Sequence, residues 1–393
     1  MSSSETGVGH EARIPLSVPS IGGHAGAYLQ ECLETNFVSS VGPFVDRFER
    51  EFADAVGARF AVACASGTAA LHLAFLVLDV GPGDDVLVAD LTFVASVNPI
   101  MYVGARPILV DAEAATYDMD PNLIVEELDR RSRAGERQPA AIEIVHLVGH
   151  PAEIESVMGA ANRHGIPVVE DASEALGATW TQGAFAGRQV GTIGRIAAFS
   201  FNGNKLITTG GGGMIVTDDE ALAARARHLS TQARLPGTAY DHDEVGYNYR
   251  LTNLAAALGV AQLEELDRLL GARRAIAERY DAAIATIDGL RSAPRAPWAD
   301  PSFWLYTAAL ETPDPGRRDR ILAALGRAGI EARPIWRPIH ATRRYADARR
   351  VGGTVADAIF DAAICLPSSS SLTTADQDRV VVAVRQAVAE TLR

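Results

Sequence analysis

The chain has 393 residues, of which 48% are hydrophobic and 22% are charged. At roughly 150 residues per domain this length predicts two or three domains, and the composition excludes a disordered or fibrous protein. The formal charge of −13 disfavours nucleic acid and anionic membranes as partners, because phosphate groups repel an acidic surface.

The first two-thirds of the chain carry the pattern of a layered α/β fold. Residues 1–13 are small and polar, and we expect a disordered tail there. From residue 60 onward, short runs of successive apolar residues alternate with helical patterns, which is typical of strands buried on both faces of a mainly parallel sheet. The predicted strands are residues 60–64, 86–89, 108–110, 141–146, 167–170, 196–201 and 213–216, and the predicted helices include residues 69–78 and 154–163.

After residue 251 the pattern changes to long helices and then to a smaller α+β unit. Four leucines form an apolar stripe at helical spacing, which predicts a linking helix: Leu263, Leu266, Leu269 and Leu270. We expect a helix near residues 318–328, a strand near 330–335 and a final helix from about Thr374. The predicted division is a tail at 1–13, a large domain at 14–255, and a linking helix with the small domain at 256–393. About 25 residues at the start of the large domain are expected to pack on the small one.

A single lysine is the first candidate for catalysis. Lys205 lies in FSFNGNKLITTGGGG, between an apolar strand and four consecutive glycines, and no other lysine occurs in the chain. A partly buried amine has a lowered pKa and attacks an aldehyde at neutral pH, so this position favours a Schiff-base lysine. The alternative is a solvated loop lysine, which the glycines disfavour because they permit close approach of a ligand.

A carboxylate at the end of a predicted strand is the second candidate. Asp171 lies in VVEDASEALG, and ligands of open α/β sheets bind beyond the carboxyl ends of the strands. There Asp171 could hold a pyridinium nitrogen through a charge-assisted hydrogen bond. The alternative is a helix N-cap.

The segment ACASGTAALHLAF places Ser66, Gly67 and Thr68 between a strand and a helix. Free N–H groups at a helix N-terminus bind phosphate, and glycine allows an oxyanion to approach, although a simple capped helix has the same pattern. No Walker motif and no G-x-G-x-x-G opens a helix, which argues against nucleotide hydrolysis and against a nicotinamide-dependent oxidoreductase.

The cysteines and the N-terminal sequence indicate the compartment. Cys32, Cys64 and Cys365 are too few and too scattered for a disulfide framework or a zinc site, so we expect no metal and a reducing, cytoplasmic location. No secretion signal or membrane span is indicated by the sequence.

Several motifs together resemble the DegT/DnrJ/StrS family of pyridoxal-phosphate (PLP)-dependent sugar aminotransferases. SGTAALHLA, EDASEALG, FSFNGNK with TTGGGG, and GYNYRLTNLAAALGVAQLE occur in the order that the family has, over nearly the whole chain. NFVSSVG, FNGNK and TTGGGG look closest to the LegC-like and perosamine-synthase-like branch. The resemblance implies the aspartate aminotransferase-like fold, PLP-dependent transferase fold type I, with a mostly parallel sheet in the large domain.

The resemblance also implies roles for individual residues. Lys205 matches the Schiff-base lysine that also acts as acid and base, and Asp171 matches the partner of the pyridine nitrogen. The other positions that match cofactor-binding residues are Glu174 near the ring hydroxyl, Phe93 stacked on the ring, and Gly67, Thr68 and Ser200 at the phosphate. Asn248, in GYNYR, matches a residue that reaches the phosphate of the neighbouring subunit, with Arg250 nearby. This match implies a homodimer with shared active sites.

The implied reaction moves an amino group from L-glutamate to C4 of a nucleotide-linked 4-keto-6-deoxy sugar, with PLP cycling through pyridoxamine 5'-phosphate. The nucleotide diphosphate requires cations, and Arg333, Arg337 and His340 are the candidates, with Trp304 and Tyr306 as faces for the sugar or base. Two alternatives stay open: an aminotransferase for a 3-keto sugar or keto-cyclitol in antibiotic biosynthesis, and a PLP-binding regulator without turnover.

Overall fold

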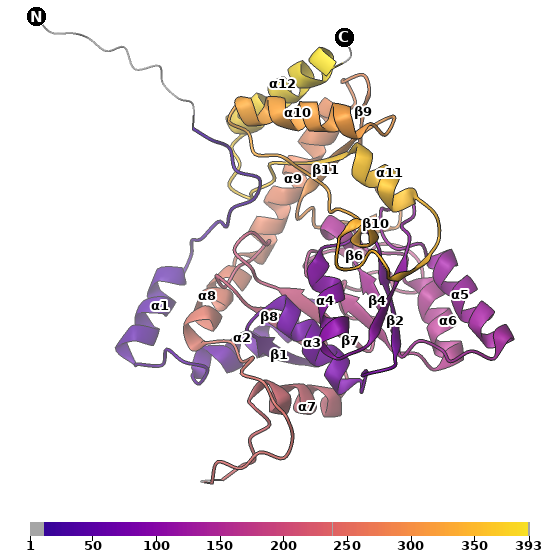
Figure 1. Ribbon diagram of the computed structural model, residues 1–393. Coiled ribbons are helices and arrows are strands. Elements are labelled where there is room, and N and C mark those ends of the chain that lie inside the picture. Colours follow the sequence, from indigo (N-terminus) through magenta and orange to yellow (C-terminus); the bar gives the residue numbers. More distant parts are fainter. Residues whose placement is uncertain (1–11, 238, 392–393) are drawn as a thin grey trace, which may run out of the picture.

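The computed structural model describes residues 12–237 and 239–391, so residues 1–11 of the expected tail lie outside the described part. Figure 1 shows a large sheet in the lower half of the molecule and a smaller sheet in the upper half. A two-stranded pair, β6 (Thr179–Trp180) with β10 (Ala299–Asp300), adds to these two sheets. No helix in the described ranges has both the length and the apolar character needed to cross a bilayer.

The large sheet has eight strands, and all of them run parallel except β8. Their order is β1 (Phe60–Cys64), β8 (Gly213–Thr217), β7 (Ile196–Ser200), β5 (Val168–Asp171), β4 (Ala141–Val145), β2 (Asp85–Ala89), β3 (Arg106–Val110) and β13 (Arg349–Val351). The seven strands predicted from apolar runs are confirmed. The eighth, β13, comes from the C-terminal third of the chain and pairs with β3 at the edge of the sheet.

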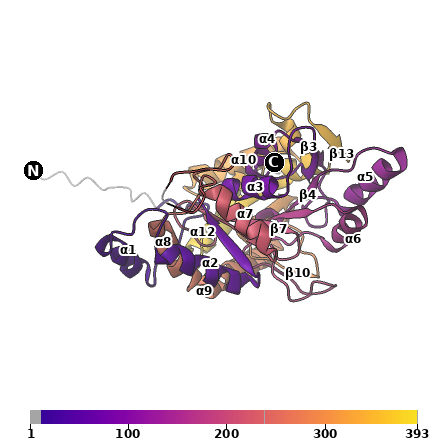
Figure 2. The ribbon, with the colours of Figure 1, turned by 90° about the horizontal axis from the view of Figure 1, so that it is seen from below.

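Helices cover both faces of the large sheet, which makes three layers (Figure 2). One layer contains α3 (Gly67–Val77), α4 (Val94–Tyr102) and α7 (Glu220–Ser230). The other contains α2 (Pro43–Val56), α5 (Pro121–Ala134), α6 (Glu155–His164) and α8 (Asn253–Leu263), and α1 (Ala25–Glu34) packs on α8. Because successive strand residues enter opposite layers, Val168 and Val169 belong to different apolar clusters. This explains the continuously apolar strands.

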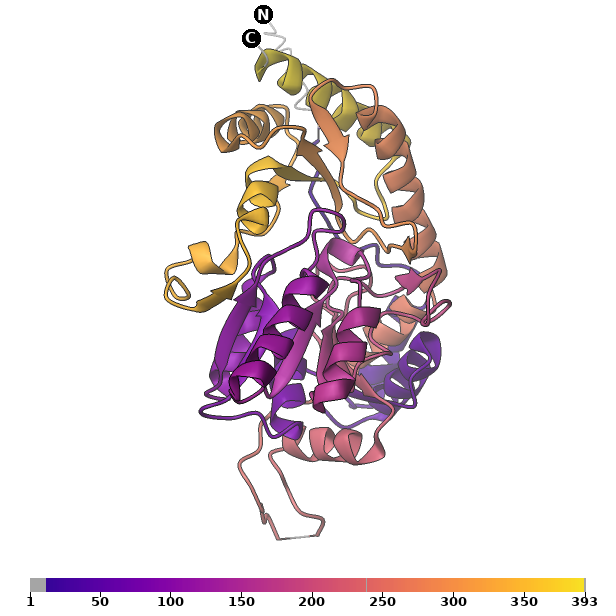
Figure 3. The same ribbon diagram turned by 90° about the vertical axis from the view of Figure 1, so that its right-hand side faces the viewer.

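The smaller sheet is antiparallel, in the order β12 (Arg333–Pro334), β14 (Ala363–Leu366), β11 (Tyr306–Leu310) and β9 (Leu290–Ser292). It packs with α9 (Leu266–Ile284), α10 (Pro315–Arg327), α11 (Val355–Ala362) and α12 (Thr374–Thr391) around one apolar cluster. Figure 3 shows α9 rising along one side from the large sheet to the small one. Ile14 pairs with Ile330 and joins the same cluster, so the N-terminal segment contacts the small unit. The boundary at residue 255 stays a prediction.

The carboxyl ends of β2, β4, β5 and β7 meet at the edge of the large sheet that faces the smaller sheet. In parallel sheets the loops that follow these ends form ligand sites. The fold therefore gathers the turn at Ser66, the loop after Ala89, and the residues that follow Asp171 and Ser200 in one place.

Candidate active site

A cavity of about 280 Å³ lies at this edge, and most of the residues predicted from the sequence line it. The predicted residues on its wall are Gly67, Thr68, Phe93, Asp171, Glu174, Ser200, Lys205 and Trp304. They come from five separate segments of the chain, and only the fold brings them together.

Lys205 reaches into the cavity from the loop after β7. Its side chain is only 13% exposed, and its Nζ lies 3.7 Å from Oε1 of Glu174 and 3.6 Å from the ring centroid of Trp304. Burial lowers the pKa of the Lys205 amine, and the carboxylates of Glu174 and Asp171 offset part of that shift. A larger share of the amine is therefore unprotonated near neutral pH than for a surface lysine, and this is the form that attacks a carbonyl carbon.

Asp171, the last residue of β5, is 4% exposed and is held from two sides. Its Oδ2 accepts a hydrogen bond of 2.8 Å from Oγ of Ser96, which in turn lies 2.8 Å from Oγ1 of Thr92. Its Oδ1 accepts the backbone N–H of Ser173 at 3.0 Å. Neither Thr92 nor Ser96 was predicted, although Thr92 directly precedes Phe93 and Ser96 lies in the first turn of α4. These bonds come from neutral donors and fix the position of the carboxyl group, which suits a partner for a cationic ring nitrogen.

Glu174 joins two loops to the lysine. Its Oε2 accepts the N–H of Val148 at 2.8 Å, and its Oε1 accepts the indole N–H of Trp336 at 3.2 Å. Burial raises the pKa of Glu174, while the nearby Lys205 amine lowers it. The carboxyl group is therefore a proton partner of the amine that is fixed in place from both sides.

The N-terminus of α3 forms the floor of the cavity. Ser66 is its N-cap, with Oγ accepting the N–H of Ala69 at 3.1 Å, so the capped-helix alternative also holds. At Gly67, a Cβ atom would lie 2.8 Å from Cβ of Ser200, so only glycine fits without a shift. The first-turn N–H groups and the Ser200 hydroxyl thus form a cradle for an anionic group.

Three aromatic side chains lie over this cradle. The ring of Phe93 is 47% exposed, and its centroid lies 4.9 Å from that of Trp336, which stacks at 6.1 Å on Trp304. Trp336 was missed from the sequence, where only the cations of RPIWRPIH were considered. The rings offer flat apolar faces to a planar ligand.

A buried arginine holds Trp304 against the lysine. Arg273, on α9, is 1% exposed, and its Nη1 donates to the carbonyl of Trp304 at 2.6 Å. Its other nitrogens donate to the hydroxyls of Ser17 and Ser370, each at 3.1 Å. The carbonyl of Asn204 accepts from both Ser17 and the Trp304 indole, at 2.8 and 2.7 Å. The backbone next to Lys205 is therefore tied to both ends of the chain.

The remaining predicted residues do not line this cavity. Asn248 pairs with Thr231 in an isolated bridge, and Arg250 makes a 2.7 Å ion pair with the buried Glu49. Among the C-terminal cations, Arg333 pairs with Glu331 at 3.0 Å. His340 lies between Asp90 and Asp357, at 2.5 and 3.2 Å. Arg337 is exposed and follows Trp336, and Tyr306 is buried in the small unit.

Known proteins share both the sequence and the fold. Residues 19–385 match the DegT/DnrJ/EryC1/StrS aminotransferase family. The chain is 39% identical to the GDP-perosamine synthase of Caulobacter vibrioides (strain ATCC 19089 / CIP 103742 / CB 15), covering 95% of this chain and 98% of that one. It is 37% identical to the GDP-perosamine synthase of Escherichia coli O157:H7, covering 85% and 87%.

The fold is similar to the crystal structure of the aminotransferase TlmJ from Streptoalloteichus hindustanus, with a TM-score of 0.87 at 28% identity. The alignment covers 97% of this chain and 100% of that one. The match extends over both sheets, and the expected fold type I architecture is confirmed. The chain belongs to the DegT/DnrJ/EryC1/StrS family of PLP-dependent aminotransferases.

Proposed function

We propose that this aminotransferase moves an amino group from L-glutamate to C4 of a nucleotide-linked 4-keto-6-deoxy sugar. The observation that carries the proposal is the single buried Lys205 amine, which faces Glu174 and Asp171 in one cavity. The choice of substrate is supported by the similarity to GDP-perosamine synthases at 37–39% identity.

The residues of the cavity fit PLP. A phosphate matches the cradle at Gly67 and Ser200, where an added Cβ would fill the space, and a flat ring matches the open face of Phe93. Asp171 would hold the ring nitrogen and Lys205 the carbonyl carbon. When bound, PLP supplies an aldehyde that takes up the amine and a cationic ring that withdraws electrons.

We propose that Lys205 is the acid and base of the reaction. With PLP and an amino donor bound, the free Lys205 amine would take a proton from the donor carbon and hold it at Nζ. Glu174, 3.7 Å away, holds the protonated amine in position, and Trp304 lies across its other side. The same two residues exclude water from the amine.

For the sugar and its diphosphate we propose Trp304 and Arg337. Trp304 lines the cavity, and Arg337 makes no hydrogen bond or ion pair within the described ranges. Arg333 and His340 are weaker candidates because carboxylates already hold them. A guanidinium group that is free of a partner pairs readily with two phosphate oxygens.

We also propose a homodimer in which Asn248 completes the site of the partner, with Arg250 positioning it. Asn248 ends a loop, residues 231–237 and 239–248 of the described chain, that extends from the body below α7 in Figure 1. The loop carries Tyr240 and Val245, which are 81% and 80% exposed. Such exposure of apolar side chains is typical of a surface that another chain covers.

The cytoplasm is the compartment that we propose. Cys32, Cys64 and Cys365 are all buried and free, which is usual where thiols stay reduced.

Absorbance spectra test the proposal. The protein is reconstituted with PLP, and spectra are taken alone, with L-glutamate, and then with a panel of 4-keto nucleotide sugars. We expect a band that glutamate removes and one 4-keto sugar restores. Asp171→Ala should keep the fold, measured by circular dichroism, but lose most turnover, because an uncharged ring nitrogen withdraws electrons poorly.

Lys205→Ala is the control, and it should bind PLP without the band of the lysine adduct. A band that responds to glutamate but only to 3-keto sugars or keto-cyclitols would replace the substrate assignment. A wild-type rate in Asp171→Ala would contradict the role of that carboxylate, and absence of any response to amino donors would favour a regulator.

A further inference from the structure

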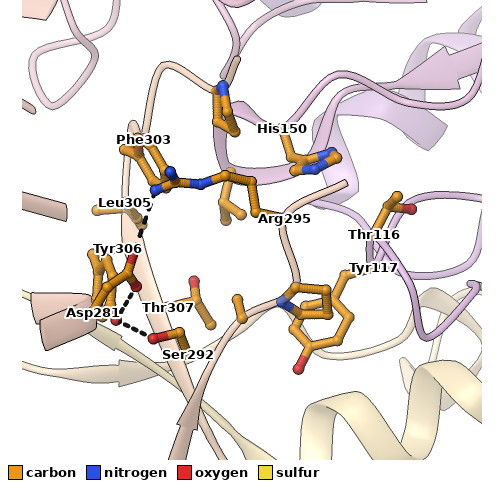
Figure 4. Close-up of a pocket in the computed structure, with 14 residues that line it drawn as sticks. Thr116, Tyr117, His150, Asp281, Ser292, Arg295, Phe303, Leu305, Tyr306 and Thr307 are labelled. Atoms are coloured by element: carbon orange, nitrogen blue, oxygen red, sulfur yellow. Dashed lines mark hydrogen bonds and ion pairs between the residues drawn. The ribbon is translucent and has the colours of Figure 1, made fainter. Parts of the chain in front are cut away.

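A second cavity, of about 310 Å³, lies between the large and small units, on the other side of the segment that carries Trp304. Figure 4 shows Arg295, Asp281, Tyr306 and Ser292 linked along one side of it. In the same view His150, Thr116 and Tyr117 lie on the opposite side. Nothing in the proposed transamination uses these residues.

The walls of this cavity hold strained backbone. Among the described residues, seven that are not glycine have positive φ, and three of these line the cavity: Tyr117 at 72°, Val148 at 48° and Phe303 at 50°. Left-handed backbone is unfavourable for bulky and β-branched side chains, and such strain clusters at ligand sites and switch regions. The hydroxyl of Tyr117, whose side chain is 1% exposed, also has no hydrogen-bond partner within the described part of the chain.

Two side chains of the wall, Arg295 and Asp281, form an ion pair and are 42% and 37% exposed. Arg295 lies 3.2 Å from Oδ2 of Asp281, whose Oδ1 accepts the hydroxyl of Tyr306 at 2.8 Å. A carboxylate has about four acceptor sites and a guanidinium has five N–H donors, so both keep unused capacity side by side. Because Asp281 neutralises the charge of Arg295, the pair attracts a free anion only weakly. A neutral ligand that has hydrogen-bond donors and acceptors side by side on one edge can bind to both groups.

Phe303 is the partly exposed aromatic ring of this cavity, and the Arg295 guanidinium lies 4.7 Å from its ring centroid. Tyr117 and Tyr306 also border the cavity, but their side chains are only 1% and 2% exposed. A flat heteroaromatic ring with donors and acceptors on its edge is the chemistry of a nucleobase, and bases stack on aromatic side chains.

We propose that this cavity is a second ligand site that binds the base of a nucleoside or nucleotide, and that its occupancy alters the environment of Lys205. The base contacts Arg295 and Asp281 through its edge and the Phe303 ring through its face. The site is separate from the catalytic cavity, and its existence does not depend on which keto sugar the enzyme aminates.

Two segments lie between the cavities, and through them a ligand in the second cavity can affect the catalytic cavity. Val148 borders the second cavity, and its N–H donates to Glu174, the carboxyl group beside Lys205. Phe303 borders the second cavity, and the next residue, Trp304, covers the Lys205 amine. A shift of either strained residue therefore changes a group in direct contact with the amine.

Calorimetric titration of the PLP-loaded protein with guanosine, uridine and thymidine tests the site, because nucleosides carry no phosphate for the catalytic cradle. We expect saturable one-to-one binding of at least one nucleoside, weakened at least tenfold by Arg295→Ala and by Asp281→Asn. Lys205→Ala should leave this binding intact. Bound nucleoside should also shift the pH midpoint of the cofactor absorbance band in the wild-type protein.

Arg279→Ala is the matched control, since it removes another ion pair of α9, with Asp378, outside the cavity. It should bind nucleosides as the wild type does. No binding of any of the three at millimolar concentration, or binding that Arg295→Ala leaves unchanged, would overturn the site. Binding without any change of the absorbance band would overturn the link to Lys205. No outcome of the titration depends on turnover of a sugar.

Discussion

Glu143 lies on β4, is fully buried, and neither of its carboxyl oxygens has a hydrogen-bond partner in the described ranges. It pairs with Val169 across the sheet, so its side chain shares a face with Asp171, two residues further along β5. Burial, with a smaller contribution from Asp171, raises the pKa of Glu143 well above its usual value. Burial therefore favours the protonated form of Glu143 on the same face of the sheet as Asp171.

This predicts a pH-dependent effect of Glu143→Gln on stability. A pKa raised by folding stabilises the protein below the unfolded pKa of about 4.5, and this stability is lost as pH rises toward the folded pKa. The glutamine variant does not titrate, so its advantage over wild type should grow by up to about 1.4 kcal/mol per pH unit across that window. Urea unfolding at pH 5 and pH 8 measures the difference. An equal difference at both values would contradict a protonated Glu143, and Glu278→Gln on the surface controls for the loss of a charge.

The chemistry at single positions could be predicted where a motif carries it. Lys205 and Asp171 follow directly from their places at strand ends. Thr92 and Trp336 could not be predicted, because their contacts arise only when distant loops meet. The cations near residue 337 were predicted from charge alone, and the sequence gives no sign that Asp90 and Asp357 already hold His340.

At the level of elements, the short helical turn Leu147–Gly149 is the junction between the two cavities. Gly149 has φ of +97°, and an added Cβ would lie 2.5 Å from Oγ of Ser302 and 2.9 Å from the backbone nitrogen of Trp304. Its carbonyl also accepts the N–H of Ser302 at 2.9 Å. The turn and the segment before β11 therefore pack backbone to backbone.

Gly149→Ala should destabilise the protein by about 1–3 kcal/mol, because it adds overlap to left-handed strain. Gly57→Ala is the matched control. The φ of Gly57 is +79° and the space around it is open, so this substitution adds left-handed backbone strain without any overlap between atoms. Urea unfolding of both variants should show the larger loss at Gly149, and only that variant should change the cofactor absorbance. Equal losses and unchanged spectra would argue against the close packing of this junction.

The elements themselves were largely predictable. Continuous apolar runs predicted seven of the eight strands of the large sheet, since burial on both faces leaves a strong pattern. The edge strand β13 (Arg349–Val351) was not predicted, because two of its three residues are exposed arginines and its pairing with β3 depends on the tertiary fold. The linking leucines predicted one helix, but α8 ends at Leu263 and α9 begins at Leu266.

For the whole molecule, the proposed dimer predicts that the loop carrying Tyr240 and Val245 is a contact surface. Light scattering should give about twice the chain mass of 41.7 kDa, and the double variant Tyr240→Arg, Val245→Arg should shift the protein toward monomer. The affinity for PLP should fall as the protein becomes monomeric, because Asn248 would no longer reach the site of the partner. Val382→Arg, at another exposed apolar residue on α12, should change neither property. A monomeric wild type that binds PLP tightly would contradict the shared site.

The network around Arg273 has a consequence for how the enzyme is made. It joins Ser17, the backbone beside Lys205, Trp304 and Ser370, so the catalytic lysine is anchored by segments from near both ends of the chain. Once residue 217 has been synthesised, every strand of the large sheet except β13 is present. The contacts of Arg273 with Trp304 and Ser370 need residues that are synthesised later. The catalytic centre therefore matures only after almost the entire polypeptide has left the ribosome, and a truncated chain would fold its sheet around a lysine that is not yet held for catalysis.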